Sequence, residues 1–252
     1  MCAICGCEGD EHEHGHEHEH EHEHVHVHEP VHQRVRVEAD LLEKNRRIAE
    51  DNRGWLADRR VLAINLLSAP GAGKTTLLER ALRELSRSIT VQVIEGDQAT
   101  SRDAERIRAT GARCVQINTG TGCHLDALMV QRALGELDPP PGALVFIENV
   151  GNLVCPALFD LGEHSKVVLF SVTEGEDKPL KYPHIFRASD RMLLTKTDLL
   201  PYVRFDSERA IANALEVNPR LRVMAVSSET GAGFADLYGF IRSVSETVHA
   251  HG

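Results

Sequence analysis

A phosphate-binding loop is the feature that most constrains what this chain can fold into. The loop, Ser68–Thr76, reads Ser-Ala-Pro-Gly-Ala-Gly-Lys-Thr-Thr and directly follows the apolar run Val61–Leu67. It matches G-x-x-x-x-G-K-[ST] at Gly73, Lys74 and Thr75, with Ser in place of the first Gly. Small residues let backbone N–H groups surround phosphate oxygens, the lysine adds a positive charge, and the threonine hydroxyl can hold Mg²⁺. The loop predicts a nucleoside triphosphate site made by Gly71, Ala72, Gly73, Lys74, Thr75 and Thr76.

Short β-rich runs alternate with helix-compatible runs from Val61 onward. The predicted strands are Val61–Leu67, Thr90–Glu95, Val115–Asn118, Ala143–Glu148, Lys166–Val172, Arg191–Thr195 and Arg222–Val226. The predicted helices are Thr76–Ser86, Ser101–Ala109, Leu125–Leu137, Ser207–Leu215 and Phe234–Thr247. Continuous apolar strands separated by helices indicate an α/β fold, a mostly parallel sheet flanked by helices as in P-loop nucleoside triphosphatases. Ligands of such sheets lie at the carboxyl ends of the strands.

Three parts of the chain differ in composition. Residues 1–32 hold nine acidic residues, ten of the fifteen histidines and no Lys or Arg, so they account for nearly all of the net charge of −10. This low-complexity segment cannot bury a core, and we expect it to be disordered. Residues 33–60 form a predicted helical lead-in, in which Gly54 is expected to end the first helix. Residues 61–250 form the predicted P-loop domain.

The N-terminal extension carries metal-binding side chains. Cys2, Cys5 and Cys7 can close on one soft metal ion, with Gly6 allowing the tight turn. The dense imidazoles that follow bind Ni²⁺, Cu²⁺ or Zn²⁺ when neutral. The alternative is a solvated charged tail. No basic, apolar leader or transmembrane run is present, so we expect a cytoplasmic protein with thiols rather than disulfides and no membrane partner. The folded part has no basic stripe for nucleic acid.

Acidic residues end two of the predicted strands. Asp97 follows the second strand and is a natural ligand for Mg²⁺ or for the attacking water. Glu148 ends the fourth strand in the place of a Walker B acid, and Gly151 can present its N–H to the γ-phosphate. Either acid could instead cap a helix. With the phosphate loop present, we predict that Lys74, Asp97 and Glu148 are catalytic and that Thr75 and Asp97 hold Mg²⁺.

Two further segments concern the nucleotide base. The segment Thr195-Lys196-Thr197-Asp198 resembles the guanine motif Asn-Lys-x-Asp, with Thr in place of Asn. Asp198 could accept hydrogen bonds from N1–H and the exocyclic amine of guanine, a donor pair that adenine lacks. A second segment beginning at Ser227 resembles the other guanine loop. We therefore expect GTP and GDP as ligands, with Lys196, Asp198 and Ser227 around the base.

A second set of metal ligands is predicted inside the P-loop domain. Cys123 and His124 follow the third strand, and Cys155 lies a few residues beyond the fourth. A Cys-His pair with a distant Cys is a plausible three-ligand set for Zn²⁺ or Ni²⁺, completed by water or a second subunit. The alternative is two buried loop thiols and a surface histidine. Cys114 precedes an apolar strand and is expected to be a small core residue.

Together these residues resemble the HypB family of hydrogenase nickel-incorporation GTPases, in the signal-recognition/MinD-type class. The resemblance runs from about residue 38 to the C-terminal helix, plus the N-terminal thiols. It is carried by Cys2-x-x-Cys5-Gly6-Cys7, the His tract, Ser68–Thr76, Glu95-Gly96-Asp97, Asn118-Thr119-Gly120-x-x-Cys123-His124, Glu148–Pro156 and Asp177–Pro183.

The resemblance implies a GTPase that delivers nickel to the large subunit of [NiFe]-hydrogenase. It implies a dimer promoted by GTP, with a metal site of Cys123, His124 and Cys155 near the dimer interface. It also implies a tight nickel site at Cys2, Cys5 and Cys7, and a HypA-type zinc-containing chaperone as partner.

Two other functions remain open at this point. One is a urease-type nickel-insertion GTPase, although that family has a Cys-Pro-His metal motif, whereas Cys123 and His124 are adjacent here. The other is a non-enzymatic nickel storage protein in which the His tract acts alone. The intact Lys74, Asp97 and Glu148 argue against storage alone.

Overall fold

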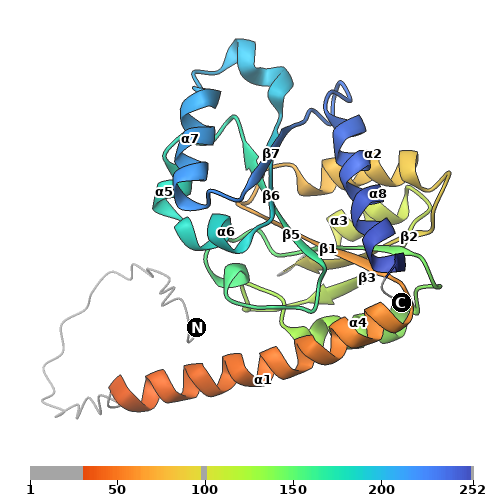
Figure 1. Cartoon of the computed structure of the whole chain (residues 1–252). Coiled ribbons are helices and arrows are strands. Elements are labelled where there is room, and N and C mark those ends of the chain that lie inside the picture. The colour runs from red at the N-terminus through yellow and green to blue at the C-terminus, as the bar shows by residue number, and fades with distance from the viewer. Residues whose placement is uncertain (1–30, 98–100, 251–252) are drawn as a thin grey trace, which may run out of the picture.

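A seven-stranded, fully parallel sheet forms the centre of the part of the chain that this computed structural model describes, residues 31–97 and 101–250. The strand order is β3-β2-β4-β1-β5-β6-β7, with helices on both faces (Figure 1). The strands are β1 (Leu62–Ser68), β2 (Val91–Asp97), β3 (Arg113–Asn118), β4 (Leu144–Glu148), β5 (Ser165–Ser171), β6 (Arg191–Thr195) and β7 (Arg222–Ala225). The α-helices are α1 (Val31–Asp58), α2 (Lys74–Leu85), α3 (Arg102–Arg108), α4 (Ala127–Leu137), α5 (Lys178–Lys181), α6 (Pro183–Ala188), α7 (Ser207–Val217) and α8 (Phe234–Ala250). Two 3₁₀ helices are η1 (Cys155–Ala157) and η2 (Thr197–Tyr202).

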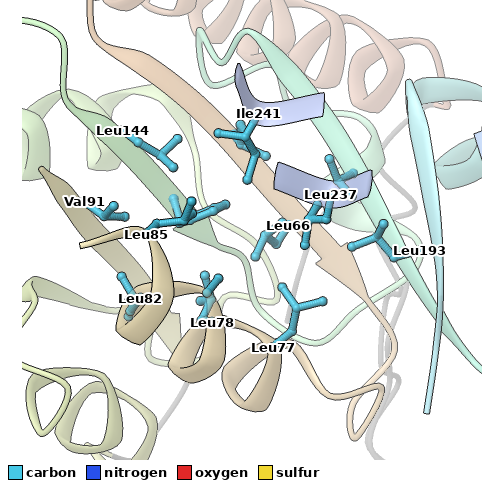
Figure 2. Close-up of a cluster of buried hydrophobic side chains, with 14 of the residues drawn as sticks. Leu66, Leu77, Leu78, Leu82, Leu85, Val91, Leu144, Leu193, Leu237 and Ile241 are labelled. Atoms are coloured by element: carbon cyan, nitrogen blue, oxygen red, sulfur yellow. The ribbon is translucent and has the colours of Figure 1, made fainter. Parts of the chain in front are cut away.

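The central strands are buried on both faces, which is why their sequences are continuously apolar rather than alternating. One face packs against α2 and α8, where Leu66, Leu78 and Leu237 belong to a single buried cluster (Figure 2). The other face is covered by α1 and α4 over β1, β2 and β4, and by α6 and α7 over β5 and β6. Figure 1 shows α1 running beside α4, with its N-terminal end extending past the body of the domain.

The predicted fold class is confirmed, because all seven predicted strands are present and every strand pair is parallel. The five predicted helices correspond to α2, α3, α4, α7 and α8. Helices α5 and α6 were not predicted, because they are short and each has Pro in its first turn. None of the described helices is long and apolar enough to cross a membrane.

Three details of the sequence prediction were wrong. Helix α1 begins at Val31, so Val31 and His32 are helical, whereas we expected them to belong to a disordered segment. The helix also continues through Gly54 to Asp58, because Leu56, two residues further on, is buried in the cluster that α1 shares with α4. Cys114 lies within β3 rather than before it, and packs partly buried against the α2 side of the core as a small core residue would. The extension itself, with Cys2, Cys5, Cys7 and most of the His tract, lies outside the described residues.

Two glycines near α1 should respond to alanine in opposite directions. At Gly54 an added methyl group meets nothing within 4 Å, so Gly54→Ala should raise the free energy of unfolding by about 0.5–1 kcal/mol. Gly162 has φ +89°, and its added methyl would lie 2.6 Å from the Ala49 carbonyl oxygen of α1. Gly162→Ala should therefore lower the free energy of unfolding by roughly 2–5 kcal/mol, because alanine is strained in the left-handed conformation and its methyl group overpacks the contact with α1. Urea unfolding of both variants checks this prediction. Equal changes in the free energy of unfolding would contradict the close contact between the loop that contains Gly162 and helix α1.

Candidate nucleotide and metal sites

The phosphate loop joins β1 to α2 and surrounds a cavity of about 450 Å³. Gly71 and Gly73 have φ of +74° and +97°, a left-handed conformation that L side chains rarely adopt. This backbone curls the loop around the N-terminus of α2, where free N–H groups and the helix dipole favour an anion. Among the cavity's lining residues are Gly71, Gly73, Lys74, Thr75, Thr76, Asp97, Glu148, Gly151 and Lys196. The structure thus brings together most of the residues predicted to bind the phosphates.

Lys74 and Thr75 are held in place by hydrogen bonds inside the loop. The Lys74 ammonium donates to Ser68 Oγ at 2.9 Å, which explains why Ser at the first motif position is compatible with the loop. The Thr75 hydroxyl donates to Glu148 Oε1 at 2.8 Å. Burial lowers the pKa of Lys74, and the nearby acid Glu148 opposes that shift. Gly151 lies against the loop, because a methyl group added there would meet the Pro70 backbone at 3.1 Å.

Glu95 is a site residue to which the sequence analysis assigned no role. It pairs in register with Glu148 across β2 and β4, and both side chains are buried, with one carboxylate oxygen of each lacking a hydrogen-bond partner. Burial, together with the nearby charges of Glu148 and Asp97, raises the pKa of Glu95 to about 8. Burial likewise raises the pKa of Glu148 to about 7. The signal in the sequence was the two-residue spacing from Glu95 to Asp97, which puts both on one face of β2.

These oxygens suit a hard cation. Hydroxyl and carboxylate oxygens are the ligands that Mg²⁺ prefers. Asp97 and Glu148 line the cavity beside Thr75, and the buried oxygens of Glu95 and Glu148 are the orphaned acceptors that a hydrated cation would satisfy. The residues present therefore fit the Mg²⁺ ion that accompanies a nucleotide phosphate in a phosphate-loop fold.

A second cavity of about 170 Å³ adjoins the phosphate loop and is lined by Ala72, Thr195, Lys196 and Asp198 among others. Thr195 Oγ1 donates to the Ala72 carbonyl at 2.7 Å, and Lys196 Nζ donates to the Gly71 carbonyl at 2.7 Å. The threonine that replaces the usual asparagine thus still ties β6 to the loop. The buried Ser227 hydroxyl donates to Asp198 Oδ1 at 2.6 Å, so its side chain orients Asp198.

Cys123, His124 and Cys155 come together as predicted. Their ligand atoms all lie within 4.8 Å of one another, although Cys155 is 31 residues from His124 along the chain. Both thiols are buried, and the His124 ring stacks on Phe159 with centroids 3.9 Å apart. Burial lowers the pKa of His124, which favours the neutral imidazole that a metal requires. Two sulfurs and one imidazole nitrogen suit zinc or nickel.

Helix α1 fastens the segments that follow these ligands. The Asn45 carboxamide donates to the Asp160 carbonyl at 2.7 Å and accepts from Ala127 N at 2.8 Å. Asn52, two turns later, donates to the Ala127 and Leu161 carbonyls at 2.8 and 2.9 Å. Each asparagine therefore bridges the start of α4 to the loop after Cys155. Sequence reasoning missed both, because their partners are 75–115 residues away.

Comparison with known proteins identifies the family of this chain. A family model described as "CobW/HypB/UreG, nucleotide-binding domain" matches residues 62–225. Hydrogenase maturation factor HypB of Rhizobium leguminosarum bv. viciae is 56% identical over 207 residues, which cover 82% of this chain and 69% of that protein. The chain belongs to the HypB family. This confirms the resemblance inferred from the motifs.

Solved HypB structures share the fold. HypB from Archaeoglobus fulgidus aligns with a TM-score of 0.75 at 39% identity, over 81% of this chain and 99% of that one. HypB from Helicobacter pylori, solved in complex with nickel, aligns with a TM-score of 0.75 at 33% identity, over 81% and 96%.

The buried Glu95 should make the stability of the nucleotide-free protein depend on pH. Its pKa is about 8 when folded against an ordinary value of 4.5, so the folded state binds the proton more tightly. The stability that this proton confers is complete below pH 4.5 and is lost as the pH rises towards 8. Glu95→Gln removes this loss, so its free energy of unfolding relative to the parent should increase between pH 5 and pH 8.

Urea unfolding at the two pH values measures this difference. The matched control is Glu208→Gln, at an exposed position in the first turn of α7, which should leave the pH dependence of the parent unchanged. A difference between Glu95→Gln and the parent that is the same at both pH values would contradict the assigned shift.

Proposed function

We propose that this chain is a GTP-hydrolysing nickel metallochaperone that binds nickel and delivers it for the maturation of [NiFe]-hydrogenase. The observation that carries the proposal is the shared position of two sites. Asp97 and Glu148 end β2 and β4 at the phosphate cavity, and the Cys123, His124 and Cys155 cluster follows β3 and β4 at the same edge of the sheet. The relatives' name, hydrogenase maturation factor, and the nickel complex of the H. pylori protein support the assignment of cargo and client.

In the proposed hydrolysis, the phosphate loop binds GTP and the strand-end acids orient the reacting groups. Lys74 stabilises the negative charge that develops on the phosphate oxygens. Thr75 and Asp97 would hold Mg²⁺, which supplies further charge neutralisation when bound. Glu148 fixes the Thr75 hydroxyl and helps to organise the attacking water, and the Gly151 N–H faces the γ-phosphate. Asp198, oriented by Ser227, reads guanine.

In the proposed metal chemistry, Cys123, His124 and Cys155 bind nickel as cargo, and the same soft donors also accept Zn²⁺. Three ligands leave the coordination shell open, so water or a second subunit completes it. Cys2, Cys5 and Cys7 form a separate nickel site on the extension. The proposed setting is the cytoplasm. The proposed partners are a second copy of the chain, bound in the GTP state, a HypA-type chaperone and the hydrogenase large subunit.

The proposed guanine contact predicts a change of nucleotide preference. Asn at position 198 can still accept from N1–H, and its amide can donate to the carbonyl that xanthine carries in place of the guanine amine. Asp198→Asn should therefore lose GTP turnover and gain turnover of xanthosine triphosphate. Phosphate release from both nucleotides measures this, with Asp198→Ala as the control that should use neither well. GTP turnover that is unaffected in both variants would refute the base site.

A further inference from the structure

Asn149 lies between the nucleotide cavity and the metal cluster. It directly follows Glu148, and its N–H donates to the Leu66 carbonyl at 3.1 Å, so the strand ladder continues through it. Consecutive residues on a strand point to opposite faces. Glu148 accordingly meets Thr75 on the α2 face, whereas the buried Asn149 side chain lies on the face covered by α1 and α4.

One oxygen of Asn149 is shared between the two sites. Asn149 Oδ1 accepts from Leu125 N at 3.2 Å and from Val150 N at 3.0 Å. Leu125 directly follows His124 of the metal cluster, and Val150 directly precedes Gly151 beside the phosphate loop. A single carboxamide thus joins the backbone of both segments.

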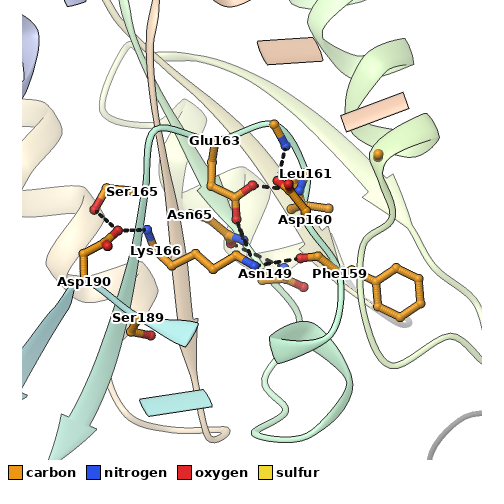
Figure 3. A network of polar contacts seen from close by, with 12 residues as sticks. Asn65, Asn149, Phe159, Asp160, Leu161, Glu163, Ser165, Lys166, Ser189 and Asp190 are labelled. Carbon is orange, nitrogen blue, oxygen red and sulfur yellow. Dashed lines mark hydrogen bonds and ion pairs between the residues drawn. The ribbon is translucent and has the colours of Figure 1, made fainter. Parts of the chain in front are cut away.

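The orientation of this carboxamide is set by a buried network (Figure 3). Glu163 accepts from Leu161 N at 2.7 Å, and its other oxygen lies 3.6 Å from the Lys166 ammonium, so both oxygens face donors. A carboxylate that faces donors on both oxygens acts as an acceptor, and Glu163 Oε1 accepts a hydrogen bond from Asn65 Nδ2 at 3.0 Å. The Asn65 oxygen is then directed towards Asn149, and it accepts from Asn149 Nδ2 at 3.4 Å. Because the Asn149 amide NH₂ group is directed at Asn65, the Asn149 side chain can present only its oxygen to the N–H groups of Leu125 and Val150.

The same network also contacts the metal cluster through Lys166 and Phe159. Lys166 Nζ donates to the Phe159 carbonyl at 3.1 Å, and the Phe159 ring stacks on His124. The Lys166 contact holds the Phe159 backbone, and the Phe159 ring in turn packs on the His124 imidazole. His124 is therefore contacted through Phe159 as well as through the Leu125 backbone that follows it.

We infer that Asn149 is a positioning residue that couples the nucleotide state to the geometry of the Cys123, His124 and Cys155 cluster. This inference rests on the proposed function. If the Gly151 N–H binds the γ-phosphate, the Val150 N–H beside it moves relative to Asn149 Oδ1. The shared oxygen then changes its bond to Leu125, one residue from His124. The two ligands thereby alter each other's affinity by the same factor.

The test is a nickel titration of the full-length chain carrying Cys2→Ser, Cys5→Ser and Cys7→Ser. In this parent the thiolate-to-nickel charge-transfer band reports the internal cluster, because nickel bound to the His tract gives no such band. The affinity is measured with Mg²⁺ and GDP and with Mg²⁺ and a non-hydrolysable GTP analogue. Coupled sites typically differ by about 5–150-fold. We expect the ratio of the nickel affinities in the two nucleotide states to lie in that range for the parent and to be near one for Asn149→Ala.

Asn218→Ala is the matched control. Asn218 is also a buried asparagine, and its Nδ2 donates to the Phe186 and Ser189 carbonyls at 3.0 Å, near the amino-terminal end of β6 and away from both sites. It should lower the melting temperature as Asn149→Ala does but keep the parent's ratio. If alanine at position 149 prevents folding, Asn149→Ser, whose hydroxyl is too short to reach Leu125, should show the same loss.

Each outcome decides a separate point. A parent ratio that Asn149→Ala and Asn149→Ser retain would overturn the role of Asn149 alone. A control that loses the ratio as well would assign the effect to general loosening and overturn the inference. A parent ratio of one would show that the sites are not coupled, and the absence of the charge-transfer band would overturn the proposed nickel site itself.

Discussion

The parallel register of β1, β2 and β4 is the constraint on which the rest of the structure depends. Leu66 of β1 and Glu95 of β2 both pair with Glu148 of β4, so the three strands end almost level. This alignment puts the phosphate loop after β1 beside the acids that end the other two strands. A slip of one residue would turn Glu148 away from Thr75 and point its charge into the apolar core under α4.

Burial of polar groups follows from the same alignment. Glu95, Glu148 and Asn149 are buried near the carboxyl ends of β2 and β4, and Asn65 is buried in the middle of β1. On the α1 and α4 face these groups are satisfied by one another and by Glu163. On the α2 face two carboxylate oxygens are left without partners, which is costly in an apolar setting and is relieved by a bound cation or by protonation. The unpartnered oxygens of Glu95 and Glu148 on the α2 face are therefore the ones that a bound ligand would satisfy.

The sequence predicted those features that depend on local pattern. The P-loop motif, each of the seven strands and the Cys-His pair depend on a few consecutive residues. The end of α1 was mispredicted at Gly54, because the packing of Leu56 outweighs the poor helix propensity of a single glycine. Asn45, Asn52 and Glu163 carry no motif, and their partners are set by tertiary folding. The spacing of Glu95 from Asp97 puts both on one face of β2, but the pairing of Glu95 with Glu148 across the sheet is set by tertiary folding.

The central claim is that the sheet edge that binds nucleotide also binds nickel through Cys123, His124 and Cys155. Nickel X-ray absorption of the chain lacking thiols at positions 2, 5 and 7, loaded with GDP and one equivalent of nickel, tests it most directly. We expect a nickel shell with two sulfur scatterers and imidazole, and the loss of one sulfur in Cys155→Ser. A sulfur count that is unchanged in Cys155→Ser would contradict it.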